Sequence, residues 1–416
     1  MNRSRFRPAN IVWMSCLLAT CAITHAADLI YPARQRLLEY RAELDALRRQ
    51  FGGSHPMPDV RFFLFGMGAR PKLVYKSGAL LESFTGKVLR QWPMKSEIIA
   101  PSDYCVSITT TGDAQVRIVE DEKAIWIEED GRRQPVAHSQ TPICLPAFGE
   151  YRYPRVLRVL HQELLVNVID GKPVPNYFAY SRPWYRDGAM VAMCLKATGN
   201  LGLIKNWLLG LKEPYDGNNG GEREADNLGQ ALYLISLVSD RNHPLVPRIL
   251  RELPRWEVQG LGGKYIQGRS DFAAHPAYQT KWAKFGLTSL GLPDPYVVPT
   301  VPDSYSALFW MAYKDSYAKG QDANDRDRYP YLGWACDHFH GTSASPIGNR
   351  DYPLTWEQEA SQARYEGMKV IGEEFVRQRL ATPHTWHAAE VFLYLLEQKK
   401  PPTVKSNSIR EARNKP

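Results

Sequence analysis

The residues best suited to chemistry stand together at the start of an apolar run. Trp184, Tyr185, Arg186 and Asp187 are consecutive. Aromatic rings stack on the faces of sugar rings, and an Arg–Asp pair can hydrogen-bond to sugar hydroxyls. An aspartate at the start of a helix can also be a simple N-cap. The segment therefore predicts either a polar binding site or a capped helix start.

Acidic residues gather in three later segments between apolar runs, at Glu224 and Asp226, at Asp271, and at Glu357 and Glu359. A carboxylic acid can protonate a leaving oxygen while a second carboxylate activates water or attacks, so these five residues are the candidate acid–base groups. Residues two positions apart on a helix do not share a face, so at most one of Glu357 and Glu359 should face a common site. Capping and solvated surface positions are the competing interpretations for all of them.

The remaining candidate substrate-binding residues are polar or aromatic and lie beside these segments: Asn227, Trp356, His384 and Trp386. The histidine pairs 338/340 and 384/387 have no further ligands at zinc-like spacing, so neither a metal nor another cofactor is predicted.

Two of these segments resemble motifs of the six-hairpin glycosidases. Residues 184–190 are similar to the W-x-R-D-x-A-M signature of glucoamylase-type enzymes, and residues 383–389 to the P-x-x-W-x-x-A motif that opens a late helix, with a fainter version at 354–356. The resemblance covers about residues 150–398. It implies an (α/α)6 toroid, a carbohydrate substrate, and Arg186 and Asp187 as the residues that hold the sugar. The Glu-rich acid segment of such enzymes is not recognisable, although Asp271 lies near the position that the general acid would take along a toroid.

Hydrophobic periodicity predicts the elements that position these residues. Residues 30–51 have the pattern of one amphipathic helix with Leu37, Leu38, Leu44 and Leu47 on its apolar stripe. Short alternating runs bounded by turn residues predict a small antiparallel sheet domain between Val60 and Cys144. After Pro154 the apolar residues recur with the period of a helix. One example is the series Ala388, Val391, Phe392 and Leu395, spaced i, i+3, i+4 and i+7.

The predicted fold class is mainly α. A toroid-like catalytic domain over residues 151–398 would follow an N-terminal helix and a small antiparallel β domain over 27–150, with a basic disordered tail at 399–416. Cys105 and Cys144 lie in the same strand-rich region and could form a disulfide.

The N-terminus has the pattern of a secretory signal peptide. Three arginines precede an apolar run and a small-residue cleavage site, with cleavage expected after Ala26. Lipidation of Cys21 is the alternative, disfavoured by the bulky Thr20. We expect a periplasmic or secreted protein, without a transmembrane segment in the mature chain.

The net charge of +8 is concentrated at the two ends of the chain. The signal contains three arginines, and the tail from Lys399 contains six Lys/Arg residues against one Glu, which leaves no excess between them. A nucleic-acid partner is therefore not expected, because it would need a basic face on the folded body.

The sequence thus predicts an exported glycoside hydrolase acting on an oligosaccharide or polysaccharide. A polysaccharide lyase using a Tyr or His base, and a non-catalytic sugar-binding protein of an exopolysaccharide system, are the alternatives. The sequence does not predict the oligomeric state.

Overall fold

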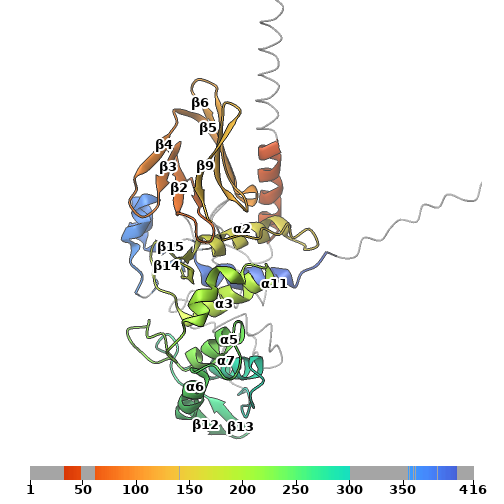
Figure 1. Cartoon of the computed structure of the whole chain (residues 1–416), viewed down its shortest axis with the longest axis vertical. Coiled ribbons are helices and arrows are strands. Elements are labelled where there is room, and N and C mark those ends of the chain that lie inside the picture. Colours follow the sequence, from red (N-terminus) through yellow and green to blue (C-terminus); the bar gives the residue numbers. More distant parts are fainter. Residues whose placement is uncertain are drawn as a thin grey trace, which may run out of the picture.

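The structure is a computed structural model. It describes residues 32–47, 61–139, 141–299, 355, 357–358, 360, 362–381 and 383–400. Two antiparallel sheets lie at one end of the molecule, and helices occupy its middle and its other end (Figure 1). The predictions for residues 1–26 and for the tail beyond residue 400 concern segments outside the described residues.

The N-terminal sheets contain nine strands in two meanders. The first sheet has the order β1-β2-β3-β4, with β1 at Phe62–Phe65, β2 at Leu73–Lys76, β3 at Ala79–Glu82 and β4 at Val88–Gln91. The second has the order β5-β6-β7-β8-β9, with β5 at Met94–Ala100, β6 at Cys105–Thr110, β7 at Gln115–Glu120, β8 at Ala124–Glu129 and β9 at Arg132–His138. Strands neighbouring in sequence pair in space, as short turns between alternating runs dictate.

The part that follows is mainly helical. Its longer helices are α2 (Pro154–Val166), α3 (Tyr185–Ala197), α5 (Asp226–Ser236), α7 (Pro276–Ser289) and α11 (Thr385–Leu396). Shorter helices are α4 (Lys205–Leu209), α6 (Val246–Glu252) and α10 (Glu373–Gln378). Three two-stranded antiparallel sheets interrupt them: β10 (Val168–Ile169) with β11 (Lys172–Pro173), β12 (Glu257–Gly260) with β13 (Gly263–Ile266), and β14 (Glu357–Gln358) with β15 (Leu380–Ala381).

The predicted (α/α)6 toroid is wrong. The described residues after 150 form eight helices, of which α4, α6 and α10 have seven residues or fewer, and these are too few for six helical hairpins. The longer helices pack in the series α2–α11–α3–α5–α7, and strands separate several of them. The fold is mixed α/β. The helical period in the sequence identifies which segments are helical, but it does not specify how many helices pair or whether they close into a ring.

The predicted N-terminal helix is present over residues 32–47, and its buried stripe is narrower than expected. Leu44 and Leu47 are buried, whereas Leu38 is 52% exposed. Glu43 accepts hydrogen bonds from the backbone and the side chain of Arg155, both at 2.8 Å. This contact fixes the helix to the start of α2.

A buried charge cluster connects the loop after β1 to the second sheet. The Glu120 carboxylate accepts bonds from Gly66 N at 2.9 Å, Met67 N at 2.7 Å and Arg70 Nη1 at 2.8 Å. The Lys72 ammonium donates to the carbonyl oxygens of Gly66 and Gly68. Burial lowers the pKa of Lys72 to about 7. We refer to Arg70, Lys72 and Glu120 as the sheet cluster.

Two glycines allow α5 and α7 to cross in close contact. A Cβ at Gly229 would lie 2.2 Å from the backbone of Trp282, and one at Gly286 would lie 2.3 Å from Gly229 O. Only glycine fits such an approach. The crossing brings the first turn of α5 beside the first turn of α7, where several candidate residues lie.

Cys105 is buried and Cys144 is exposed, and both are free thiols, so the expected disulfide between them is absent. No helix among the described residues is both long and apolar enough to span a membrane.

Candidate functional site

Four segments far apart in the sequence meet around Arg186. They are the first turns of α3, α5 and α11 and the turn that precedes α7. Arg186 is buried, and its guanidinium forms ion pairs with three carboxylates: Nη2 lies 3.0 Å from Glu224 Oε1, Nε 3.1 Å from Asp226 Oδ2, and Nη1 2.6 Å from Asp271 Oδ2. We refer to these four residues as the helical cluster. Three of the five candidate acid–base residues therefore surround one arginine.

Asp226 is the most enclosed of the three carboxylates. Besides Arg186, it accepts hydrogen bonds from Gln230 Nε2 at 2.8 Å, Ser270 Oγ at 2.6 Å and Tyr278 OH at 3.1 Å. Its side chain has no exposed surface. So many donors hold the carboxylate in one orientation, and Asp226 joins α3, α5 and α7 through a single side chain.

Glu224 lies between the other members of the cluster. Its Oε1 accepts a hydrogen bond from Asp271 N at 2.6 Å and another from Asn219 Nδ2 at 3.2 Å. Burial raises the pKa of Glu224 to about 7, and the negative charges of Asp226 and Asp271 add to this, while Arg186 opposes it. The Glu224 carboxyl group therefore keeps its proton to a higher pH than an exposed glutamate does.

Asn219 links two carboxylates. Its Nδ2 contacts Glu224 Oε1 and Asp271 Oδ1, each at 3.2 Å, and its Oδ1 accepts a bond from Gln362 Nε2 at 2.7 Å. Glu224 Oε1 and Asp271 Oδ1 each contact the same Asn219 nitrogen, so the two oxygens are at most two hydrogen-bond lengths apart.

A tight turn presents Asp271. Ser270 N donates to Ala273 O at 2.8 Å and Ala273 N to Ser270 O at 3.2 Å, while Asp271 and Phe272 between them have φ values of 47° and 67°. Positive φ at both central positions is the pattern of a type I′ turn, which favours Asn and Gly. Non-glycine residues in this region cost on the order of 1–3 kcal/mol each, and such strain is concentrated at functional sites. The Asp271 side chain is 16% exposed, the most exposed of the three carboxylates.

Aromatic rings line the cluster on the side of α11. The Arg186 guanidinium carbon lies 5.5 Å from the centre of the Trp386 ring. Tyr180 contacts both Trp184 and His384 edge-on, with ring centroids 5.9 Å apart in each pair. Of the two predicted tryptophans, Trp386 therefore lies against the Arg186 guanidinium, and Trp184 packs against Tyr180. Both side chains are buried.

Three other predicted binding residues make contacts within the protein. Asp187 accepts a long hydrogen bond of 3.5 Å from Thr385 Oγ1, which joins α3 to α11. Tyr185 OH donates to Glu213 O at 2.7 Å. Asn227 Oδ1 accepts from Asp216 N at 3.1 Å, and Asn227 Nδ2 donates to Gln230 Oε1 at 3.1 Å. These contacts give the three residues a bracing role around the cluster.

The N-terminus of α3 is capped by a residue that sequence reasoning did not select. Asp216 Oδ2 accepts the backbone N–H of Tyr185, the first residue of α3, at 2.7 Å. Burial raises the pKa of Asp216. The Asp-Gly-Asn-Asn composition of residues 216–219 indicates a loop, but nothing in it indicates that the loop reaches α3.

The C-terminal candidates are described only in part. Glu357 belongs to β14, where it pairs with Ala381, and its side chain is outside the described residues. Trp356 and Glu359 lie outside them entirely. Within the described residues, no group of three or more His, Cys, Asp or Glu side chains is arranged to hold a metal ion.

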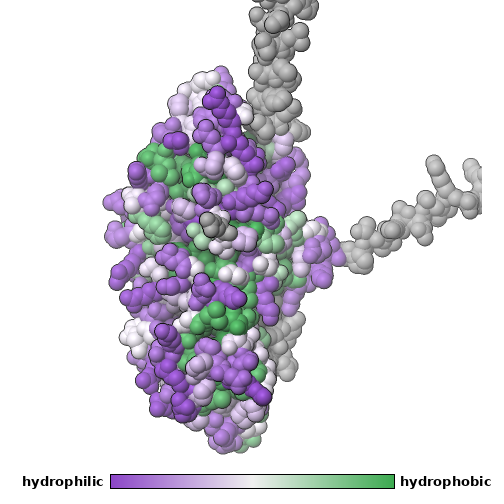
Figure 2. Space-filling view, viewed as in Figure 1, coloured by the Kyte–Doolittle hydropathy of each residue, from purple (hydrophilic) through white to green (hydrophobic). Residues whose placement is uncertain are grey.

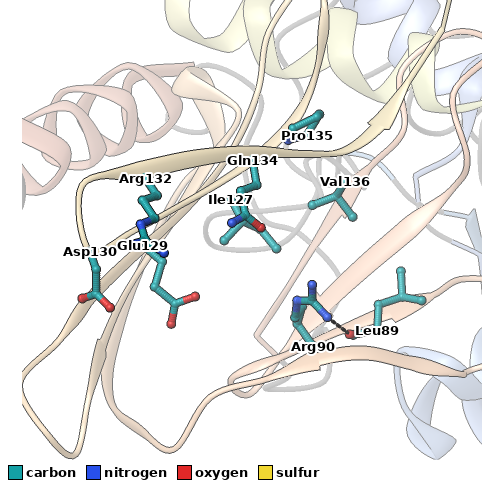
Figure 3. Close-up of a pocket in the computed structure, with 9 residues that line it drawn as sticks. All are labelled: Leu89, Arg90, Ile127, Glu129, Asp130, Arg132, Gln134, Pro135 and Val136. Atoms are coloured by element: carbon teal, nitrogen blue, oxygen red, sulfur yellow. Dashed lines mark hydrogen bonds between the residues drawn. The ribbon is translucent and has the colours of Figure 1, made fainter.

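A separate groove of about 590 Å³ lies between the two N-terminal sheets (Figure 3). Residues of the edge strands β4 and β9 and of β8 line it, among them Arg90, Glu129 and Arg132. Hydrophobic residues gather on the visible face over β3 and β4 (Figure 2). None of the candidate site residues lines this groove.

Comparisons of the chain with protein-family models, with curated proteins and with solved structures find no match.

Proposed function

We propose that the helical cluster is the active centre of a glycoside hydrolase that cleaves a glycosidic bond in an oligosaccharide or polysaccharide. The observation that carries this proposal is the convergence of Glu224, Asp226 and Asp271 on Arg186. A buried carboxyl group with a raised pKa, placed beside a second carboxylate, is the arrangement that acid–base catalysis requires.

In this proposal, Glu224 is the general acid. Its pKa of about 7 leaves a proton available at neutral pH, and glycoside hydrolysis needs such a donor at the leaving oxygen. Asp271 is the second carboxylate, because it is the more exposed and lies on the strained turn. Asp226 holds Arg186 in place and takes no part in proton transfer.

The spacing of Glu224 and Asp271 favours a retaining reaction. Carboxyl groups about 5–5.5 Å apart support retention, whereas inversion needs roughly 6.5–9.5 Å to admit a water molecule between them. The shared contacts with Asn219 fit the shorter separation. Asp271 would attack the anomeric carbon while the glycosidic C–O bond breaks and the Glu224 proton passes to the leaving oxygen. Water, deprotonated by Glu224, would then attack that carbon and release the sugar and the Asp271 carboxylate.

The charge of the cluster favours an uncharged sugar. With Glu224 protonated, Asp226 and Asp271 still outnumber the single guanidinium, so a uronate would meet like charge near Asp271. This argues against the polysaccharide lyase alternative, which requires a uronate substrate.

The proposal is tested by incubating the full chain with a panel of defined neutral and uronate oligosaccharides and measuring new reducing ends. We expect reducing ends from a neutral sugar, without the near-ultraviolet absorbance of an unsaturated product. Glu224→Gln should lower kcat by about 10²–10⁴-fold. Glu257→Gln is the matched control, because Glu257 pairs with Lys264 on the β12–β13 hairpin and should leave kcat unchanged.

Two results would overturn the proposal. Full activity of Glu224→Gln would exclude the assigned acid. Sugar-induced thermal stabilisation of the wild-type chain with no cleavage of any oligosaccharide would identify a binding protein instead.

We further propose that this activity is exported, because the N-terminus has the charge and apolar pattern of a signal peptide. N-terminal sequencing of the mature protein should give a chain that starts after Ala26. An intact Met1 on protein from the cytoplasmic fraction would contradict export.

A further inference from the structure

An exposed aromatic residue stands next to the proposed second carboxylate. Phe272 is 45% exposed, one residue after Asp271, at the second central position of the strained turn. Large apolar side chains gain stability mainly through burial, and this one remains in water. Burial therefore does not account for a phenylalanine at this position.

Backbone preference does not account for it either. A φ of 67° suits glycine or asparagine, and a bulky residue in this region is uncommon. The turn is held by its surroundings: Arg269 Nη2 donates to Phe272 O at 3.0 Å, and Asp271 N donates to Glu224 Oε1 at 2.6 Å. The protein thus maintains an unfavourable conformation that places an aromatic ring at the surface beside the helical cluster.

We propose that Phe272 is a stacking platform for a sugar ring of the substrate, next to the unit held at Arg186, and that it determines specificity for neutral chains of several sugars. This inference rests on the proposed function. The apolar face of a neutral pyranose matches an exposed ring, and stacking on a rigid aromatic costs little conformational entropy. The neighbouring Asp271 carboxylate would disfavour a uronate at the same position.

A second exposed apolar residue on a nearby turn provides a matched control. Leu261 lies between β12 and β13 and is 113% exposed. The residues that contact Arg186 do not include it. Its replacement tests whether loss of any exposed apolar side chain in this region changes substrate affinity.

The test compares Phe272→Asn, Phe272→Trp and Leu261→Ala with the wild-type chain, using the neutral oligosaccharide series that the wild type cleaves, from disaccharide to hexasaccharide. Asparagine suits the turn but cannot stack, so Phe272→Asn should raise the urea midpoint of unfolding and raise KM about tenfold for the longer sugars, with the disaccharide little changed. Phe272→Trp should keep the wild-type KM, and Leu261→Ala should change neither quantity.

The outcomes separate this inference from the proposed function. If the wild type cleaves the series and Phe272→Asn has an unchanged KM at every length, the platform is wrong while the hydrolase stands. If Phe272→Asn unfolds at a lower urea concentration than the wild type, Phe272 is a packing residue and the platform is likewise wrong. If the wild type cleaves and binds nothing in the panel, the proposed function itself fails.

Discussion

Two buried charge clusters among the described residues have opposite compositions. In the sheet cluster, two basic side chains, Arg70 and Lys72, surround one carboxylate, Glu120. In the helical cluster, three carboxylates surround one arginine. In both, burial moves the pKa of one group towards neutrality, since Lys72 is lowered to about 7 and Glu224 is raised to about 7.

Access to solvent distinguishes the two clusters. The Arg70–Glu120 pair is wholly enclosed, and its further partners are backbone groups: Gly66 N and Met67 N for Glu120, and Asp121 O for Arg70. The helical cluster includes a partly exposed carboxylate on a strained turn and an aromatic ring over its arginine. A perturbed pKa therefore marks a functional site only where a ligand can reach it.

Removing the arginine of each cluster should produce the largest effects. Arg70→Met and Arg186→Met each leave buried carboxylates without their cation, so we expect each to lower the free energy of unfolding by about 3–5 kcal/mol. Urea denaturation measures this loss. Only Arg186→Met should also abolish cleavage by the fraction that remains folded. An equal loss of kcat in folded Arg70→Met would contradict the claim that only the helical cluster is functional.

The two clusters should respond to pH in opposite directions. The folded-state pKa of Glu224 is raised above the ordinary value of 4.5, so its contribution to stability is complete below pH 4.5 and is lost as the pH rises through about 7. A pKa shift of this size corresponds to a loss of ~3 kcal/mol in the free energy of unfolding. The free energy of unfolding, measured by urea denaturation, should therefore fall more between pH 5 and pH 8 for the wild type than for Glu224→Gln.

The folded-state pKa of Lys72 is lowered from 10.5, so its contribution to stability is present above pH 10.5 and is lost as the pH falls towards 7. Lys72→Met should remove this dependence between pH 7 and pH 10, while Lys72→Arg provides a variant that stays charged. Identical slopes for the wild type and Lys72→Met would show that Lys72 titrates at its ordinary pKa in the folded protein.

Substitution of a glycine at the contact between α5 and α7 should have an intermediate effect on stability. Gly229→Ala places a methyl group against the Trp282 backbone and should lower the free energy of unfolding by about 1–3 kcal/mol, even though alanine favours helix. Gly202→Ala is the control, because no atom lies within 4 Å of its added Cβ. Equal stability of the two variants would mean that α5 and α7 do not cross in this way.

The smallest effect is expected at a surface ion pair. Lys95 and Asp113 lie 2.7 Å apart with side chains 59% and 73% exposed. Lys95→Ala should change the free energy of unfolding by less than about 0.5 kcal/mol, because solvent screens such a pair. A loss comparable to that of Arg70→Met would show that enclosure is not what separates strong from weak pairs here.

The sequence predicted local features better than long-range ones. The alternating runs indicated antiparallel strands, and the apolar stripe of α11 was correct at Ala388, Val391, Phe392 and Leu395, all of which are buried. Glu224, Asp226 and Asp271 were selected because acidic residues stand in short segments between apolar runs, but nothing in the sequence placed them all on Arg186. Asn219, Ser270 and Tyr278 were missed because ordinary polar residues gain their roles only through tertiary contacts. The toroid was wrong because periodicity does not encode closure.

Titration of the Glu224 carboxyl group tests the central claim most directly. Protein labelled with ¹³C at the glutamate side-chain carboxyl carbon should show one resonance that titrates near pH 7 and is absent from Glu224→Gln. If every glutamate resonance titrates below pH 5, Glu224 is ionised at neutral pH, and the helical cluster holds no proton donor for glycosidic cleavage.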